Sequence, residues 1–312
     1  MRVLIDADIV VFRCGFAAEH MMWYLAHDRD ERNQDGSMKE FDGFKSTEEF
    51  RYKSEAMERL DAILPGKHSR VEGEDYNLWC ERQLAPVSHA YQNVNTLVRS
   101  IQEATGVTDF DTHMYLSSGK DNFRYDVATT RPYKGTRDNG HRPTHEAAIR
   151  DYIIEHWSTT VAEGEEADDL LGIEQSADPD GTIIVSIDKD LNQIPGLKYN
   201  FVDDRTYEVT LEQAVYNFHI QLMAGDSTDN IPGLPGIGPG KAAKALHGIT
   251  DPHEQQRECW RMYQIHSGVK DPWAYMIEQG QLLWIRREVG EMWQPVIQQE
   301  GEAWDAEDLS MF

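Results

Sequence analysis

Acidic side chains recur at the ends of the segments that the sequence predicts to be β-strands. Asp6 closes the first apolar strand, within "RVLIDAD", and the apolar run "GTIIVSI" is followed by "DKD". Because the carboxyl ends of parallel strands meet at one edge of a sheet, we expect these carboxylates to converge there. The acids assigned to this edge are Asp6, Glu166, Asp168, Asp169, Asp188, Asp190, Asp226 and Asp229.

So many carboxylates at one edge would repel one another strongly unless cations neutralised them. Hard oxygen ligands without His or Cys suit Mg²⁺ or Mn²⁺. Two such ions about 4 Å apart activate water and stabilise charge on a phosphodiester that is being cleaved. Each acid alone has a plainer interpretation, since Asp168 and Asp169 would complement a helix dipole and Asp229 would suit a turn. The cluster as a whole favours the metal site.

A basic segment, "GKDNFRYDVATTRPYKGTRDNGHR", reverses the sign of charge in an otherwise acidic chain. Its cations are Lys120, Arg124, Arg131, Lys134, Arg137 and Arg142, interleaved with Phe123 and Tyr133. Cations bind phosphates, and an aromatic ring can stack on an unpaired base. The segment follows a predicted strand and would rise from the same sheet edge as the acids, so it is a candidate path for a substrate backbone. The alternative is a solvated loop with incidental charge.

The stretch "GDSTDNIPGLPGIGPGKAAKAL" joins two of the acids to a glycine-rich hairpin. Gly236 and Gly238 let backbone N–H groups approach a phosphate, and Pro239 suits the first turn of a helix that carries Lys241 and Lys244. Such a hairpin grips duplex DNA through its backbone without reading sequence. Its carbonyl groups can also hold a monovalent cation such as K⁺.

Strands alternate with helices over most of the chain, which predicts a mostly parallel sheet with helices on both faces. Strands are expected at the amino terminus and over 112–118, 181–188 and 198–204, and helices over 89–105, 144–157 and 166–177. Residues 20–88 are charged and poor in β-branched side chains, so they are expected to form an insert of helices and loops. After about residue 208 the chain is expected to be helical, with an acidic tail.

Composition sets wider bounds. The 312 residues carry a net charge of −25, which taken alone argues against a nucleic-acid partner, so the local distribution of charge has to decide. The three cysteines have no CxxC spacing, which fits a reducing compartment. Asp6 and Asp8 interrupt the apolar amino terminus, and no apolar run is long enough to span a bilayer. We therefore expect a cytoplasmic protein with no membrane partner.

Taken together, several motifs resemble the 5′-nuclease superfamily, which includes flap endonucleases and the 5′-to-3′ exonuclease domain of DNA polymerase I. They are "LIDAD…VFR", "RPYKGTR", "EGEEADDLLG", "SIDKDLNQI" and "MAGDSTDNIPGLPGIGPGKAAKAL". "DPHEQQRECW" and "IEQGQLLWIRR" look closest to the short 5′-to-3′ exonucleases of podophages. The resemblance covers most of the chain outside 20–90. It implies an α/β fold with a PIN-like, mostly parallel sheet flanked by helices, a helical arch and a C-terminal helix-hairpin-helix-type DNA-binding subdomain. The implied domains are 1–207, catalytic, and 208–312, DNA-binding.

The resemblance also implies roles for individual residues. The first metal would be held by Asp6, Glu166 and Asp168, with Asp169 nearby or acting through water. The second would be held by Asp188, Asp190, Asp226 and Asp229. Lys134, Arg124 and Arg137 would contact the scissile phosphate, and Tyr133 would stack on the terminal base. DNA contacts would come from Arg13, Arg131, Gly236, Gly238, Lys241 and Lys244.

One departure from the family pattern concerns the first metal site. The family usually places an aspartate at the end of the second strand, where this chain has Ser117, Ser118 and Gly119 in "YLSSGKDNFR". Asp121 is the only candidate replacement, and it comes late. Mg²⁺ often keeps several water ligands, so one missing carboxylate need not abolish binding.

The resulting prediction is a monomeric Mg²⁺-dependent 5′-to-3′ exonuclease that acts on double-stranded DNA with 5′ ends in an infected host cell, in phage DNA replication or degradation. Two Mg²⁺ ions would serve it, with Mn²⁺ as a substitute. Flap cleavage and removal of RNA primers from hybrids are possible extra activities. Two alternatives stay open: a DNA-binding protein with weak or no catalysis, and a ribonuclease of the PIN class. The DNA-anchoring hairpin disfavours the second.

Overall fold

The computed structural model describes residues 1–27, 47–63, 76–136 and 142–297, and these form two compact units. Unit 1 comprises Met1–Val11, Val94–Arg142 and the chain from Arg150 onward, and unit 2 comprises Phe12–Asn93 and Pro143–Ile149. The helices α1 (Ala7–Ala17), α3 (Val87–Thr105) and α5 (Glu146–His156) have residues in both units. Each unit is described by itself below.

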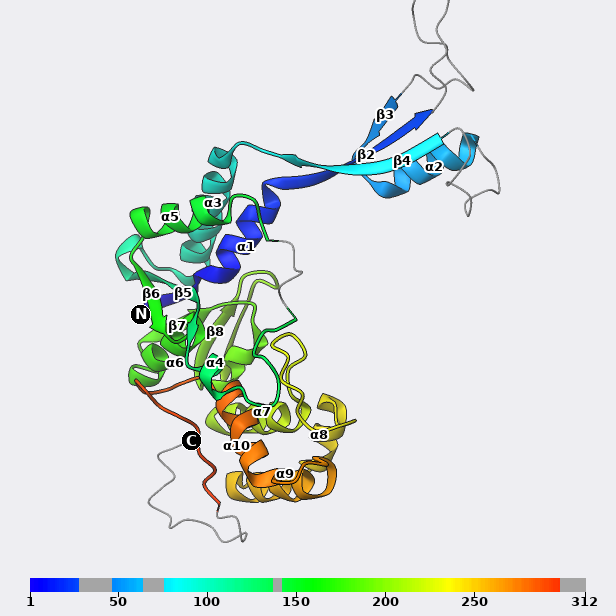
Figure 1. Ribbon diagram of the computed structural model, residues 1–312. Coiled ribbons are helices and arrows are strands. Elements are labelled where there is room, and N and C mark those ends of the chain that lie inside the picture. Colours follow the sequence, from blue (N-terminus) through cyan, green and yellow to red (C-terminus); the bar gives the residue numbers. More distant parts are fainter. Residues whose placement is uncertain (28–46, 64–75, 137–141, 298–312) are drawn as a thin grey trace, which may run out of the picture. The chain divides into compact units, whose positions relative to one another are not determined.

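Unit 1 is built on a six-stranded sheet in the order β6-β5-β1-β7-β8-β9. Figure 1 labels β5, β6, β7 and β8 of this sheet. The strands are β1 (Arg2–Asp6), β5 (Thr112–Asn122), β6 (Thr159–Gly164), β7 (Thr182–Val185), β8 (Gly196–Asn200) and β9 (Arg205–Val209). All neighbours pair in parallel except β8 and β9. The predicted mostly parallel sheet is confirmed, and β1 lies between β5 and β7, so the acids that follow these strands share one edge.

Two strands and two helices show how well local patterns predicted unit 1. The edge strands β6 and β9 were not anticipated, because each is short and mostly polar, with few of its side chains buried. The apolar spacing in α3 was a better guide, since Val94, Val98 and Ile101 are fully buried. The predicted helix over 166–177 is α6 (Ala167–Ala177).

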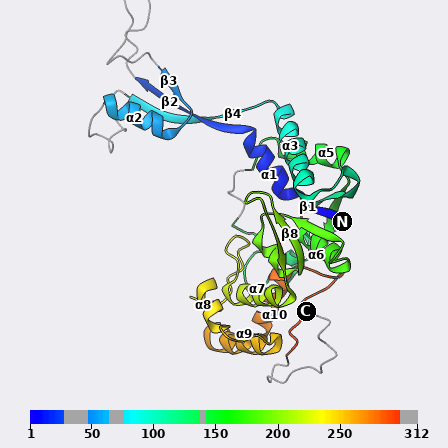
Figure 2. The same cartoon turned by 180° about the vertical axis from the view of Figure 1, so that it is seen from behind.

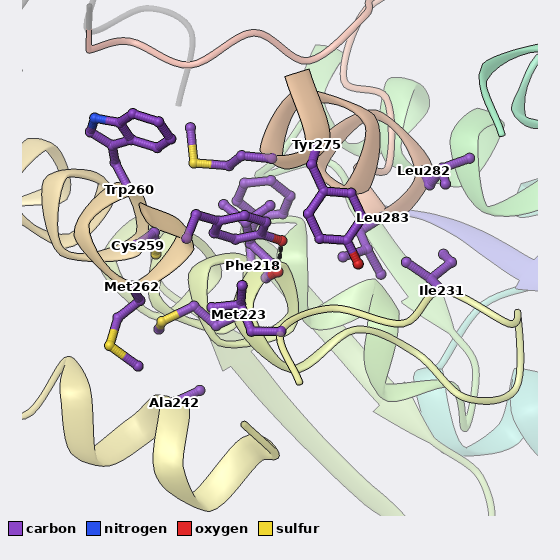
Figure 3. Packing of buried hydrophobic residues seen from close by; sticks show 14 of the residues in the cluster. Phe218, Met223, Ile231, Ala242, Cys259, Trp260, Met262, Tyr275, Leu282 and Leu283 are labelled. Atoms are coloured by element: carbon purple, nitrogen blue, oxygen red, sulfur yellow. Dashed lines mark hydrogen bonds between the residues drawn. The ribbon is translucent and has the colours of Figure 1, made fainter. Parts of the chain in front are cut away.

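Four C-terminal helices gather beside one another in both views (Figures 1 and 2). They are α7 (Leu211–Ala224), α8 (Pro239–Ala245), α9 (Pro252–His266) and α10 (Pro272–Leu283). Their core is aromatic: Phe218 meets Trp284 edge-on at 4.8 Å, and the Tyr263 hydroxyl donates to the Leu222 carbonyl at 2.5 Å. Figure 3 shows members of this core, among them Phe218, Met223 and Tyr275. The predicted division at residue 208 does not separate two compact units. The segment that follows α10 packs against the sheet side of unit 1, as the contacts of Arg124 show below.

Unit 2 contradicts the prediction of helices and loops for residues 20–88. It has a three-stranded antiparallel sheet, β3-β2-β4, and the helix α2 (Lys53–Ile63) (Figure 2). Its strands are β2 (Glu19–His27), β3 (Thr47–Phe50) and β4 (Tyr76–Leu84). The sequence signal was weak because β2 and β4 lack β-branched residues and β3 has only Thr47. Cross-strand side-chain pairs stabilise the sheet instead, as where the Tyr24 ring stacks on the Trp79 ring with their centroids 5.5 Å apart.

Two further expectations concern the arch and the membrane. The resemblance implied a helical arch. The described residues between β5 and α5 contain only the short helix α4 (Arg124–Val127), and residues 137–141 lie outside the described part. The acidic tail also lies outside it. No helix in the described ranges is long and apolar enough to cross a membrane.

Lys198 on β8 gives the fold a measurable pH dependence. Its side chain is 3% exposed, its ammonium donates to Gln175 on α6, and burial lowers the pKa of Lys198 to about 7. Between pH 7 and 10.5 the unfolded chain therefore holds a proton that the folded chain releases, so folding becomes less favourable as pH falls through this window. Lys198→Met removes this penalty but leaves the Gln175 carbonyl without its donor. We expect the variant to be more stable by about 1–3 kcal/mol at pH 7.

Urea denaturation at pH 7, 8.5 and 10 measures this effect. The advantage of Lys198→Met should shrink steadily toward pH 10.5. A difference that stays constant across the three pH values would show that the Lys198 proton does not contribute.

Candidate metal-binding and active site

A serine at the end of β7 links the acids of two neighbouring strands. The Ser186 hydroxyl donates to Asp6 Oδ2 at 2.8 Å and accepts the Asp188 backbone N–H at 2.9 Å. Asp188 in turn caps a short 3₁₀ helix (Lys189–Gln193), because its Oδ1 accepts the Asp190 N–H at 2.9 Å. The predicted meeting of β1 and β7 acids at one sheet edge is thus seen, and Ser186 was not anticipated.

The first group of carboxylates comprises Asp6, Glu166, Asp168 and Asp188. Burial, followed by the charges of Asp8 and Asp188, raises the pKa of Asp6 to about 7. Burial, followed by Asp6, Asp188 and Glu166, raises the pKa of Asp168 well above its usual range. These acids therefore lie close enough to oppose one another's ionisation, which a bound cation would relieve.

The second group comprises Asp188, Asp190, Asp226 and Asp229. Burial, followed by Asp188 and Asp226, raises the pKa of Asp190 to about 7, and Asp229 adds a smaller effect. Gln221 on α7 donates to Asp190 Oδ1 at 2.5 Å. Asp226 stands in a tight turn, where its Oδ1 accepts the Thr228 N–H at 2.7 Å. Asp188 acts on both groups, so the two are adjacent.

Lys134 and Tyr133 lie between the two groups. The Lys134 ammonium is 2.5 Å from Glu166 Oε1 and 3.8 Å from Asp229 Oδ2. The Tyr133 hydroxyl is 3.0 Å from Glu166 Oε2 and 2.9 Å from Asp229 Oδ2, so it can donate to either. The structure brings Lys134 together with acids of both groups, and its contact with the scissile phosphate stays a prediction. Base stacking by Tyr133 is contradicted, because its ring is only 4% exposed and its hydroxyl is held by the acids.

Arg124 does not face the site, and its predicted contact with the scissile phosphate is wrong for this structure. Its guanidinium bonds both Asp169 oxygens, at 2.6 and 2.8 Å, and donates to the carbonyls of Leu282 and Trp284. Burial opposes its charge, but Asp169 raises the pKa of Arg124 further. Asp169 is likewise buried, and Arg124 holds both of its carboxylate oxygens, so neither oxygen is available for direct metal binding in this arrangement. This pair ties α4 and α6 to the segment after α10.

The missing strand-end acid has no direct replacement. Asp121 is exposed, whereas Asn122 is buried and its amide donates to Glu166 Oε1 at 3.0 Å. At Ser117, the expected position, the backbone N–H donates to Asp8 Oδ2 at 3.0 Å. Asp8 also pairs with Arg150 at 2.9 Å. Sequence reasoning did not assign Asn122, Asp8 or Arg150 to the site, although the "DAD" spacing was a signal for Asp8.

The predicted DNA anchor forms a turn followed by α8. Gly236 has a positive φ of 72°, and Gly238 precedes Pro239 at the first turn of the helix. Lys241 and Lys244 are exposed, as a phosphate contact requires. The Lys241 ammonium donates to the Gly236 carbonyl at 2.7 Å, so a K⁺ ion there would compete with this cation. The DNA contacts and the K⁺ site stay predictions.

The three remaining basic residues of the predicted site lie in different parts of the chain. Arg131 is exposed and lines a hollow of about 490 Å³ together with Tyr125 and Lys134. Arg13 belongs to unit 2, so its relation to the acids stays a prediction. Arg137 lies outside the described residues.

The donor set fits a divalent cation by its chemistry. Both groups offer hard carboxylate oxygens, and their raised pKa values show mutual repulsion that positive charge would offset. In the part of the chain that the structure describes, no three His, Cys, Asp or Glu side chains already stand in a metal-holding arrangement. The fit is therefore one of ligand type rather than of preformed coordination.

Comparison with known proteins gives partial matches. No protein-family model matches the chain. DNA polymerase I of Bacillus subtilis (strain 168) is 33% identical over 43% of this chain and 18% of that protein. Flap endonuclease Xni of Shewanella sediminis (strain HAW-EB3) is 31% identical over 34% of this chain and 49% of that protein. The chain thus spans less than half the length of the curated relatives it matches.

Among solved structures, T5 5′-exonuclease with bound zinc is 19% identical, with a TM-score of 0.41 over 61% of this chain and 76% of that one. A TM-score of this size supports no statement about the site. Two kinds of curated relative, DNA polymerase I and flap endonuclease Xni, match at 31% identity or better. These sequence relatives support the resemblance to the 5′-nuclease superfamily.

Proposed function

We propose that this protein is a divalent-metal-dependent 5′-nuclease that hydrolyses DNA phosphodiesters. The observation that carries the proposal is the pair of adjacent carboxylate groups that share Asp188, in which burial and mutual repulsion raise the pKa values of Asp6, Asp168 and Asp190. Structural carboxylates seldom keep such repulsion, whereas bound cations would offset it and would also attract a phosphate. The similarity to flap endonuclease Xni and DNA polymerase I supports DNA as the substrate class.

Each group has a separate task in the proposed reaction. Asp6, Glu166 and Asp168 would hold the first ion, and Asp188, Asp190, Asp226 and Asp229 the second. Bound there, the ions would lower the pKa of a water molecule and stabilise charge on the phosphate. Lys134 lies between Glu166 and Asp229 with its side chain 18% exposed, so its ammonium can donate to a phosphate oxygen that enters between the groups.

The finer assignment follows the resemblance. We propose Mg²⁺ as the working ion, with Mn²⁺ as a substitute, and a 5′-to-3′ direction on duplex DNA with 5′ ends. Flaps and RNA–DNA hybrids would be further substrates, a monomer the working form, and phage DNA replication or degradation in the host cytoplasm the setting. The exposed Lys241 and Lys244 would hold the duplex at a helix amino terminus.

A panel of 5′-labelled substrates tests the function. Duplex, nicked and flapped DNA and the matching RNA are incubated with Mg²⁺, Mn²⁺ or EDTA. We expect short 5′-phosphorylated DNA products with either ion and none with EDTA. The double variant Asp188→Ala, Asp190→Ala is the inactive control. Tight DNA binding without Mg²⁺-dependent products would instead favour a DNA-binding protein, and cleavage of RNA alone would favour a ribonuclease.

A further inference from the structure

One glutamate on α10 holds the start of the loop that carries Lys134. We call residues 128–135 the lysine loop. Glu278 Oε1 accepts the backbone N–H groups of Thr129 and Thr130 at 2.8 and 2.7 Å, and its Oε2 accepts their hydroxyls at the same distances. A single carboxylate therefore receives all four donors of two consecutive residues.

The far end of the lysine loop is held by the turn that carries the second group of acids. Asn230 Nδ2 donates to the Pro132 carbonyl at 2.9 Å, and the Lys134 N–H donates to the Asp229 carbonyl at 2.9 Å. Lys134 itself has a positive φ of 53°. A non-glycine residue in this region is strained and persists only where its surroundings fix it. The position of the Lys134 ammonium thus depends on both anchors.

Packing contributes little at Thr129 and Thr130 themselves, although the neighbouring Ala128 packs against the C-terminal core. Thr129 and Thr130 line hollows on two sides, one of about 490 Å³ shared with Lys134 and one of about 480 Å³ shared with Glu278. Both threonines are exposed. Hydrogen bonds to Glu278 rather than buried surface therefore hold these two threonines.

We propose that Glu278 is a positioning residue for Lys134, acting through the lysine loop. It fixes Thr129 and Thr130, and the chain then reaches Lys134 through Arg131, Pro132 and Tyr133. In the four hydrogen bonds given above, the Glu278 carboxylate contacts only Thr129 and Thr130 and neither group of acids. The inference rests on the proposed function for its effect on catalysis, but the holding of the loop stands on geometry alone.

Three variants separate the parts of this contact. Glu278→Ala removes all four hydrogen bonds. Glu278→Gln keeps a carbonyl oxygen for the two N–H groups, and its amide can donate to hydroxyls that turn to accept. Thr129→Val with Thr130→Val removes only the hydroxyl contacts. Glu254→Ala on α9 is the matched control, because it removes an exposed glutamate that pairs within its own helix with Arg257.

Amide hydrogen exchange gives a reading that does not depend on activity. Glu278→Ala should speed exchange at Thr129, Thr130 and Lys134, whereas Glu278→Gln and Glu254→Ala should leave these amides protected. The melting temperature should hardly change, because the threonines are exposed. Unchanged exchange at Lys134 in Glu278→Ala would overturn the proposal.

DNA cleavage gives the second reading. Glu278→Ala should lower kcat by between about 10-fold and 100-fold with KM nearly constant, since misplacing a catalytic group affects the chemical step. Glu278→Gln should restore most of kcat, and the valine pair should fall between. Normal kcat in a variant whose loop exchanges freely would also overturn the proposal. If the wild-type protein cleaves no DNA, the proposed function is wrong, and exchange at Lys134 alone decides whether Glu278 positions it.

Discussion

Replacing Asp169 with asparagine is expected to lower the free energy of unfolding by about 3–5 kcal/mol. Arg124 is 3% exposed and Asp169 is not exposed at all, so the substitution leaves a buried guanidinium without its counter-charge. Asp169 also accepts the backbone N–H groups of Glu166 at 3.0 Å and Arg286 at 3.1 Å. The loss therefore loosens α6, α4 and the segment after α10 together. Urea denaturation at pH 7 measures it.

The pH dependence of this loss has a definite sign. Burial alone would raise the pKa of Asp169, but Arg124 and the hydrogen bonds to Asp169 lower it below the usual 3.8. The stabilisation is therefore present above the unfolded pKa and disappears as pH falls through the lower, folded pKa. The deficit of Asp169→Asn should accordingly shrink at strongly acidic pH.

A second pair on the same helix is the control. Glu174 on α6 pairs with Arg2 at 3.0 Å, but their side chains are 39% and 45% exposed. Exposed pairs contribute about 0–1 kcal/mol, so Glu174→Gln should hardly change stability. Equal losses in the two variants would mean that the Arg124–Asp169 pair is not the buried anchor described above.

Local patterns were enough to predict where the acids meet. Asp6 and Asp188 follow buried parallel strands, and that topology brings them to one edge whatever the rest of the chain does. The same reasoning could not separate Asp168 from Asp169. Successive helical residues point about 100° apart, so only one of the two can face the edge, and which one depends on the start of α6.

The position of the Arg124 side chain is determined by residues that are distant in sequence. Its carbonyl acceptors, Leu282 and Trp284, are 158 and 160 positions away, and no local pattern links them to α4. A basic residue beside predicted acids looks like a phosphate ligand until its partners are known. Unit 2 was missed for a related reason, since the pairing of β2 with β4 spans a long stretch of intervening chain.

Asp168→Asn is expected to act in the opposite way to its neighbour, stabilising the protein without metal and abolishing cleavage with it. Asp168 faces Asp6, Asp188 and Glu166, and burial together with these charges raises its pKa well above 3.8. Ionised Asp168 therefore destabilises the fold increasingly as pH rises from the unfolded pKa through the folded one. Asparagine keeps the shape and removes the charge. In EDTA at pH 7, Asp168→Asn should melt above the wild type.

Divalent metal should reverse this order. A ligand that binds only the folded state at 100 times its Kd adds about 2.7 kcal/mol, so Mg²⁺ should raise the melting temperature of the wild type. Without the Asp168 carboxylate the variant should gain much less, and its rate of DNA hydrolysis should fall by at least about 100-fold. The crossing of the two melting curves between EDTA and Mg²⁺ tests the metal assignment apart from activity. A variant that gains as much from Mg²⁺ as the wild type would place the ion elsewhere, because the repulsion at Asp168 would then not be what the metal relieves.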